Sequence, residues 1–297
     1  MRIKNNIMKI AVIGANGQLG CDVCTAFSSS GHQVVPLNHD IVDVADYASI
    51  SPPLEQAKPH VIVNTAAMHN VDACEVDPMK SFKVNGIGAR NLARIANELD
   101  STLFYLSTDY VFDGSKMAPY VETDYPMPLN VYGNSKLAGE SFVRSIAKKY
   151  FVVRVSGLYG ANPCRAKGGN NFVKLMLKLC KERDEIRVVD DEVLTPTFTG
   201  DVARQIVAMV DMETYGLYHA TAQGSCSWYR FAAKIFELSG TQIKLSVAGP
   251  NEFPMKVPRP KYSVLENAAL KAQGMDLMPD WQDGLKKYLA VLGALKG

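Results

Sequence analysis

The chain of 297 residues has no long hydrophobic run, which limits where the protein can act. A membrane-spanning helix needs about 20 consecutive apolar residues, and no stretch of this sequence approaches that length. Residues 1–14 include basic residues, but their apolar part is a strand-length run that leads into a glycine loop. We therefore expect no signal peptide, no membrane partner and a cytoplasmic location, with Met1 or Met8 as the start.

An excess of charge of one sign is also lacking. The 32 Lys and Arg residues nearly balance the 30 Asp and Glu residues, which leaves a net charge of +2, and the two signs are interspersed. No arginine-rich arm is present, so nothing in the charge pattern indicates a nucleic-acid partner. Hydrophobic residues make up 47% of the chain and charged residues 21%, as expected of a globular protein with a sizeable core.

Spacings typical of metal ligands are absent as well. The five histidines form no paired spacing, and the one CxxC motif, Cys21 to Cys24, has no second copy. Because this motif directly follows a glycine loop, we interpret both cysteines as helix positions. We expect the six cysteines to stay reduced and expect no metal site within the chain.

Short apolar runs and helical patterns alternate through the first half of the chain. Five runs rich in Val and Ile are typical of the buried strands of a parallel sheet: 9–15, 33–38, 61–67, 102–108 and 151–156. Residues 81–99 between two of these runs have helical apolar spacing. The alternation predicts an α/β fold, a Rossmann-like doubly wound parallel sheet.

The second half is less regular and predicts a smaller, mixed α/β substrate-binding lobe. Helices are expected at 171–182, from Thr199, at 228–240 and at 281–293, and strands at 186–191 and 216–222. No linker separates the halves. We expect a dinucleotide-binding domain over 1–160 and a substrate-binding lobe over 161–297, interleaved so that the two later strands join the first domain or its edge.

The stretch from Gly14 to Gly20 has the form GxxGxxG, after the first strand and at the start of a helix. Gly14 permits the tight turn, Gly17 lets the backbone approach a diphosphate, and Gly20 lets the helix pack closely on the sheet. The N–H groups and dipole of the helix N-terminus favour phosphates. This context predicts a dinucleotide site, with a tight turn without ligand as the alternative.

The end of the second strand bears on the form of the cofactor. An acidic residue about 20 positions after the glycine loop usually binds the ribose hydroxyl in NAD sites. Here Asn38 is neutral, Asp40 comes slightly late, and no Arg is near for a 2′-phosphate. We therefore expect NADPH or NADH, with Asp43 and Val44 against the adenine or simply part of an acidic loop.

Tyr132 and Lys136 stand four apart at the start of a predicted helix, so they share one face. Thr108 ends a strand, where ligands bind in open α/β sheets. A neighbouring ammonium lowers the pKa of a tyrosine. Tyr132 can then donate a proton to a carbonyl oxygen that Thr108 holds, while hydride arrives at the carbon and Lys136 reaches the nicotinamide ribose. Taken one at a time, the three residues can also be interpreted without any catalytic role, as a Thr at a strand end, a Tyr on the surface and a Lys in solvent.

Several motifs together resemble a known family. The glycine loop, NTAA at 64–67, STDYVFDG at 107–114 and the YxxxK pair are similar to the extended short-chain dehydrogenase/reductases. Within them, residues 169–179, 195–203 and 259–267 resemble the dTDP-4-dehydrorhamnose reductase family, and the resemblance covers nearly the whole chain. It implies reduction by NAD(P)H of the C4 keto group of dTDP-4-dehydro-L-rhamnose to dTDP-L-rhamnose.

The resemblance also implies roles for individual residues. Thr108, Tyr132 and Lys136 are the implied catalytic residues, and Thr108, Asp109 and Gly157 the implied contacts of the sugar. The implied cofactor contacts are Gly14, Gly17, Gln18, Leu19, Gly20, Asp43, Val44, Ala66, Ala67, Met68, Tyr132 and Lys136. In some relatives carboxylate clusters hold Mg²⁺ at an interface, so the resemblance leaves room for such an ion and for a homodimer.

The sequence departs from the family pattern at two places. Gly157 stands where the family often has Trp, and 188–197 lacks the usual Gln and Gly and is more acidic. Tyr110 follows Asp109 where related dehydratases usually have an acid, which favours plain ketone reduction. Two alternatives stay open: a reductase or epimerase of another nucleotide sugar, and a non-catalytic NADP-binding regulatory subunit.

Overall fold

The computed structural model describes residues 7–164, 168–249, 252–253 and 256–296. Its centre is a six-stranded parallel sheet in the order β10-β5-β4-β3-β1-β2. The strands are β1 (Lys9–Ile13), β2 (Gln33–Leu37), β3 (Val61–Asn64), β4 (Thr102–Thr108), β5 (Tyr150–Val155) and β10 (Gly216–His219). The predicted doubly wound α/β fold is confirmed, and its strand order reverses between β1 and β3.

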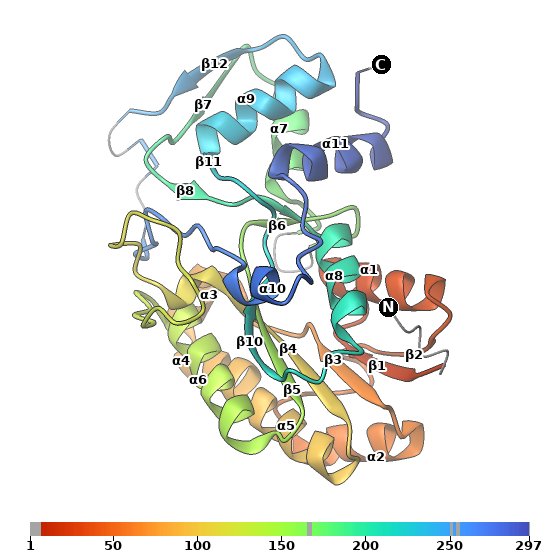
Figure 1. Ribbon diagram of the computed structural model, residues 1–297. Coiled ribbons are helices and arrows are strands. Elements are labelled where there is room, and N and C mark those ends of the chain that lie inside the picture. The colour runs from red at the N-terminus through yellow and green to blue at the C-terminus, as the bar shows by residue number, and fades with distance from the viewer. Residues whose placement is uncertain (1–6, 165–167, 250–251, 254–255, 297) are drawn as a thin grey trace.

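Helices cover both faces of this sheet (Figure 1). Helices α1 (Gln18–Ser29) and α8 (Thr199–Met209) lie on one face, and α2 (Tyr47–Ala57), α5 (Gly88–Glu98) and α6 (Val131–Ile146) lie on the other. Successive residues of β1 alternate between the two cores: Ile10 and Val12 pack toward α1, while Ala11 and Ile13 pack toward α5. Both faces are therefore apolar, which explains the nearly continuous apolar runs of the strands.

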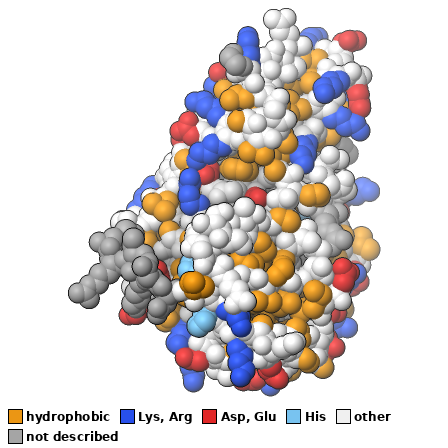
Figure 2. Space-filling model, turned by 90° about the vertical axis from the view of Figure 1, so that its right-hand side faces the viewer, with side chains coloured by type: hydrophobic (Ala, Val, Ile, Leu, Met, Phe, Trp, Pro, Cys, Tyr) orange, Lys and Arg blue, Asp and Glu red, His pale blue; other side chains and the backbone are white. Residues whose placement is uncertain are grey.

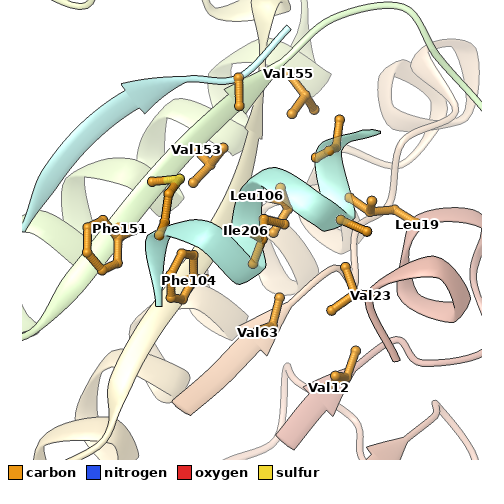
Figure 3. Packing of buried hydrophobic residues seen from close by; sticks show 14 of the residues in the cluster. Val12, Leu19, Val23, Val63, Phe104, Leu106, Phe151, Val153, Val155 and Ile206 are labelled. Atoms are coloured by element: carbon orange, nitrogen blue, oxygen red, sulfur yellow. The ribbon is translucent and has the colours of Figure 1, made fainter. Parts of the chain in front are cut away.

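The core beneath α8 joins distant parts of the chain (Figure 3). Ile206 of α8 contributes to the same buried cluster as Val23 of α1 and Phe104 and Phe151 of the neighbouring strands β4 and β5. The two rings stack with centroids 4.6 Å apart. Full burial of such a side chain stabilises the fold by about 1.5–3 kcal/mol. The second half of the chain is thus held firmly on the first.

The helix expected over 81–99 is divided. The chain forms α4 (Pro78–Ser81), a π-helical segment η1 (Phe82–Ile87) and only then α5. Asn85 and Gly86 lie inside this segment, and both residue types are poor helix formers. Asn85 is buried and bonds outside its own helix, so tertiary contacts stabilise the wider turn.

A smaller lobe lies beyond the carboxyl ends of the strands (Figure 1). Its helices α7 (Phe172–Leu179), α9 (Trp228–Ser239) and α11 (Trp281–Val291) pack around buried aromatic side chains, among them Tyr159, Phe231 and Tyr288. The lobe also contains a parallel pair, β7 (Glu185–Val188) with β12 (Lys244–Val247), and an antiparallel pair, β8 (Val193–Leu194) with β11 (Cys226–Ser227). Strands β6 (Leu158–Tyr159) and β9 (Thr197–Phe198) pair in the connection between the two parts.

The chain crosses between the two parts more than once. Helix α8, strand β10 and helix α10 (Ala268–Ala272) all come from the second half, yet they pack on or extend the large sheet. The predicted strand at 216–222 is β10, at the sheet edge beside β5. The predicted strand at 186–191 is β7, which pairs with β12 in the smaller lobe. Two short helices, α3 (Val71–Val76) and η2 (Asp109–Val111), follow β3 and β4.

Acidic and basic side chains are scattered over the face shown in Figure 2, with hydrophobic side chains between them. Within the described part of the chain, no helix has both the length and the apolar character to cross a membrane.

Candidate active site

A cleft of about 650 Å³ lies at the carboxyl ends of the strands and extends to the smaller lobe. It is lined by every residue that the resemblance implies for the reaction, the cofactor or the sugar. Those lining residues are Gly14, Gly17, Gln18, Leu19, Gly20, Asp43, Val44, Ala66, Ala67, Met68, Thr108, Asp109, Tyr132, Lys136 and Gly157. The cleft opens where the strand order reverses, which is the usual ligand position in this class of fold.

The glycine loop forms one wall of the cleft. Gly14 has φ +78°, in the left-handed region that favours glycine. A Cβ atom on Gly20 would lie 2.1 Å from the Gly14 carbonyl oxygen, so only glycine permits this approach of helix and loop. Gly17 precedes α1, and no side chain caps the helix there. The first N–H groups of α1 are thus available to an anion in the cleft.

The next wall follows β3 and depends on a residue that sequence reasoning missed. Asn85 accepts a hydrogen bond from the Met68 amide and donates one to the Met68 carbonyl oxygen, each 2.9 Å long. It also donates to Ser135 Oγ on α6 at 2.9 Å. Asn85 therefore fixes the strand-end loop that contains Ala66 and Ala67. The one signal in the sequence is an Asn-Gly pair inside an otherwise helical pattern.

Asp43 and Val44 line the far end of the groove, after β2. Asp43 accepts a hydrogen bond from the Ala45 amide at 2.9 Å, which holds its carboxylate in a local turn. Val44 is buried beneath α5, where Gly88 leaves room for it. His39 also lines the cleft, whereas Asp40, the other acidic candidate, is not among the lining residues.

Thr108 and Tyr132 meet where β4 ends and α6 begins. Asn130 caps α6 by accepting from the Gly133 amide at 2.9 Å, which fixes the helix start. A Cβ on Gly133 would lie 2.2 Å from the Tyr110 carbonyl oxygen, so glycine allows the helix to approach the strand end. Burial raises the pKa of the Tyr132 hydroxyl, and a hydrogen bond with Thr108 opposes that rise.

Lys136 is buried, with 2% of the residue's surface exposed. Its Nζ donates to the Leu106 carbonyl oxygen at 2.6 Å and lies 4.2 Å from the centroid of the Tyr105 ring. Burial lowers the Lys136 pKa to about 7, while the nearby Glu140 raises it. The expectation that Lys136 lowers the Tyr132 pKa stays a prediction, and in this structure burial dominates both groups and raises the Tyr132 pKa overall. Tyr132 is consequently a protonated hydroxyl at neutral pH.

Asp109 is buried beside Thr108. Its carboxylate accepts from Ser156 Oγ at 2.8 Å and from Thr108 Oγ1 at 3.0 Å. Burial raises the Asp109 pKa, and these hydroxyls and Ser263 oppose that rise. The carboxylate therefore orients Thr108 from behind.

The two departures from the family pattern lie next to one another in space. Gly157 has φ +57°, and a Cβ there would lie 2.7 Å from the Thr195 carbonyl oxygen and 2.9 Å from Leu194 Cδ1. Leu194 thus fills the space beside Gly157, and a large residue at position 157 would not fit this chain.

The smaller lobe lines the cleft with side chains that sequence reasoning did not assign to the site. They include Phe172, Glu192, Trp228, Phe231 and Arg259. The Trp228 and Phe172 ring centroids are 4.7 Å apart, and Trp228 Nε1 donates to Glu192 Oε2 at 3.1 Å. Burial raises the Glu192 pKa. Asp191, its neighbour, is exposed and pairs with Lys261, so one acid of this loop faces the cleft and the other does not.

The cysteines are all free thiols. Cys21 and Cys24 occupy successive turns of α1, in agreement with their interpretation as helix positions, and burial raises the Cys24 pKa to about 11. Within the described residues, no group of three or more His, Cys, Asp or Glu side chains could hold a metal ion.

Comparison with known proteins identifies the family. The model of the family described as RmlD substrate binding domain matches residues 8–293. The spore coat polysaccharide biosynthesis protein SpsK of Bacillus subtilis is 37% identical over 281 residues, covering 95% of this chain and 96% of that protein.

Two solved structures have the same fold over almost the whole chain. A dTDP-4-dehydrorhamnose reductase from Clostridium acetobutylicum aligns with a TM-score of 0.91 and 40% identity, covering 96% of this chain and 100% of that one. A dTDP-4-dehydrorhamnose reductase from Bacillus anthracis, in complex with NADP, aligns with a TM-score of 0.91 and 36% identity at the same coverage. The family resemblance in the motifs is confirmed: the chain belongs to the RmlD substrate binding domain family.

Proposed function

We propose that this protein is an NAD(P)H-dependent oxidoreductase that reduces the C4 keto group of dTDP-4-dehydro-L-rhamnose to give dTDP-L-rhamnose. One observation carries the proposal: Thr108, Tyr132 and Lys136 line the same cleft, whose lining also includes the glycine loop and several aromatic side chains. The names of the two similar solved enzymes support the same reaction.

The residues of the glycine wall fit a nicotinamide dinucleotide. The uncapped start of α1 offers N–H groups to the diphosphate, and the close approach of Gly14 and Gly20 leaves space that a side chain would fill. Gly17, Gln18 and Leu19 would hold the phosphates, and Ala66, Ala67 and Met68 the groove beyond them. Asp43 and Val44 would lie against the adenine. The bound nicotinamide supplies the hydride.

The proton comes from the protein. Tyr132 is protonated at neutral pH, because burial raises its pKa, and it lies beside Thr108. In the proposed reaction the Tyr132 hydroxyl gives its proton to the C4 oxygen. The Thr108 hydroxyl, which donates to Asp109 in this structure, turns its one proton to the same C4 oxygen and donates a hydrogen bond there. The Lys136 ammonium, held by the Leu106 carbonyl, reaches the nicotinamide ribose and stabilises the phenolate that forms.

The substrate half of the cleft fits an aromatic base and a sugar. Phe172, Trp228 and Phe231 provide apolar ring surfaces, and Arg259 provides a cation for a diphosphate. Asp109, which accepts a hydrogen bond from Thr108, and Gly157, which lines the same cleft, would contact the sugar. Two further predictions accompany this proposal, a cytoplasmic location and a homodimer. The resemblance also left room for an interface Mg²⁺, but the described residues offer no ligand cluster for one, so it is not part of the proposal.

A reductase of another nucleotide sugar is the second candidate. Two features of the substrate half of the cleft favour it: Leu194 lies beside Gly157, where the family often has Trp, and Trp228 holds the acidic Glu192 at the cleft. The regulatory alternative has less support, because the three residues that proton transfer needs are all present in the cleft.

Isotope tracing tests the proposal. The protein is incubated with dTDP-4-dehydro-L-rhamnose and NADPH, then NADH, each deuterated at the reactive nicotinamide carbon. We expect dTDP-L-rhamnose with one deuterium at C4, located by NMR. UDP-linked and other dTDP-linked 4-keto sugars serve as competitors. If only another sugar is reduced, the second candidate is correct; if none is reduced while NADPH binds, the regulatory alternative is favoured.

A further inference from the structure

A buried carboxylate lies one helical turn beyond Lys136. Glu140 follows Lys136 by four residues on α6, so both side chains project from the same face. Glu140 Oε1 accepts from Arg154 Nε at 2.9 Å, and Oε2 accepts from Arg154 Nη2 at 2.6 Å. The two side chains are 1% and 2% exposed. Removing both charges from water is costly, and an apolar pair of similar volume is often as stable. The pair therefore invites a functional explanation.

Glu140 also bonds to the strand that contains Thr108. Ser107 Oγ donates to Glu140 Oε1 at 2.5 Å. Leu106, the residue before Ser107, accepts a hydrogen bond from Lys136 through its carbonyl oxygen. Thr108, the residue after Ser107, bonds with Tyr132. Three consecutive residues of β4 thus bond to three residues of α6 that are spaced one turn apart. This set of bonds fixes the position of the helix on the strand, and with it the distance between Tyr132 and Thr108.

The charge of Glu140 faces an ammonium that burial would otherwise neutralise. Within the described part of the chain, Glu140 is the charged residue that acts on the Lys136 pKa, and it raises it. Nζ also contacts the Leu106 carbonyl and the ring of Tyr105, both from β4. Tyr105 is uncharged at neutral pH, as is Tyr132, which precedes Lys136 by one turn on α6. Farther away, Asp109 is buried at the end of β4 and Arg154 lies on β5.

Arg154 makes the contribution of Glu140 more important. One of its guanidinium nitrogens, Nη1, is buried without a hydrogen-bond partner among the described residues. Glu140 is the carboxylate that pairs with this cation, and the charge of Arg154 also acts on the half-buried Glu122. Without the carboxylate, a buried guanidinium would act on Lys136 with the same sign of charge.

We infer that Glu140 is a positioning residue for the reduction, which holds α6 on β4 through Ser107 and supplies the negative charge that keeps the Lys136 ammonium in place. This inference rests on the proposed function for its catalytic consequence. The predicted effect of Glu140 on the charge state of Lys136 does not depend on which sugar the protein reduces.

The test compares pH profiles of Glu140→Gln with those of the wild type. Loss of the carboxylate makes Lys136 release its proton at lower pH. In the wild type, kcat should fall at alkaline pH as Lys136 loses its proton. We expect this alkaline limb of the kcat profile to lie about one pH unit lower in Glu140→Gln, so that at a given pH on the limb kcat is about tenfold lower than in the wild type. The alkaline limb of NADPH affinity, followed by nicotinamide fluorescence, should move in the same direction.

Further variants separate positioning from folding. Glu140→Gln leaves Arg154 unbalanced, so Glu140→Gln with Arg154→Met removes both charges and should still show the shifted limb. Ser107→Ala keeps the charge of Glu140 and should lower kcat without moving the limb. Asp201→Asn is the matched control: Asp201 is a buried carboxylate on α8 that bonds to Lys287 at 2.9 Å and Arg204 at 2.6 Å. It should reduce stability and leave the limb in place.

The inference is overturned if folded Glu140→Gln and the double variant keep the wild-type limb in both profiles, or if Asp201→Asn moves it equally. If the wild type binds NADPH but reduces no nucleotide sugar, the proposed function fails. The pH profile of NADPH affinity then still decides the role of Glu140.

Discussion

Lys136 of α6 donates a hydrogen bond of 2.6 Å to the carbonyl oxygen of Leu106 on β4, two residues before Thr108. The bond joins the helix that contains Tyr132 to the strand that ends in Thr108. It also holds an ammonium beneath the place where the proton donor and the carbonyl holder meet. The candidate active site is therefore a product of helix-on-strand packing rather than of a flexible loop.

The cost of burying Lys136 should appear in the stability of the protein. Its pKa is lowered from 10.5 to about 7 on folding, so the unfolded chain binds more protons between these values. The free energy of unfolding should then rise with pH across this window, by up to about 1.4 kcal/mol per pH unit. The cost is fully present below about pH 7 and relieved as pH approaches 10.5.

The variant Lys136→Met should remove this rise. We expect a higher Tm than that of the wild type at about pH 7, a flatter stability curve between the two pKa values, and a loss of activity. Thermal unfolding followed by circular dichroism across this range measures the curve. Lys287→Met, which removes a half-exposed lysine on α11, is the control and should leave the slope unchanged. Equal slopes for wild type and Lys136→Met would contradict the assigned pKa.

The close approach at the glycine loop predicts a sharp effect of one methyl group. In Gly20→Ala the new Cβ would lie 2.1 Å from the backbone oxygen of Gly14, so α1 must move away from the loop. We expect NADPH affinity to fall by at least about tenfold, because the phosphate-binding N–H groups move with the helix.

Gly31→Ala is the control for strain alone. Gly31 has φ +82°, and a Cβ added there would meet nothing within 4 Å, so this change should cost about 1 kcal/mol of stability without loss of NADPH affinity. Isothermal titration measures both variants. Wild-type affinity in folded Gly20→Ala would show that the dinucleotide does not bind at this loop.

Glu192 should oppose the binding of a diphosphate. Its carboxylate lines the substrate half of the cleft and is anchored by Trp228, an interaction that Gln can keep. We expect Glu192→Gln to lower KM for the nucleotide sugar by about threefold to tenfold, with kcat little changed, because one negative charge is removed near the anion. Asp191→Asn removes a charge that does not line the cleft and should have little effect.

The pH dependence gives a second check on Glu192. Burial raises its pKa above the ordinary value, so the carboxyl group becomes neutral as pH falls toward that raised value. The wild-type KM should therefore fall with decreasing pH and approach that of Glu192→Gln, whose own KM should stay flat. A KM that rises in Glu192→Gln would mean that the carboxylate accepts a hydrogen bond from the substrate.

Local patterns were sufficient to predict the fold and to bring together the main candidates. The strand runs, the glycine spacing and the four-residue spacing of Tyr132 and Lys136 are all periodic signals, and parallel strands bring their carboxyl ends to one edge. Thr108 could be placed with them because it ends a strand.

Other parts of the site depend on contacts between segments far apart in the sequence. Asn85 bonds to Met68, Glu140 bonds to Arg154, and Leu194 occupies the space beside Gly157. The members of each pair are too far apart in the sequence for any helix or strand periodicity to predict their contact. The packing of α8 on α1 and the insertion of β10 beside β5 are likewise tertiary choices, so the sequence left the boundary between the two lobes imprecise.

The most direct test of the proposed chemistry is the turnover of dTDP-4-dehydro-L-rhamnose by Tyr132→Phe, with NADPH affinity measured on the same protein. Removing the proton donor should lower kcat by about 10²–10⁴-fold while NADPH binds as in the wild type. Tyr110→Phe, which changes the ring 5.7 Å away, is the control and should retain most of the activity. Near wild-type turnover in Tyr132→Phe would contradict the assignment of Tyr132 as the proton donor.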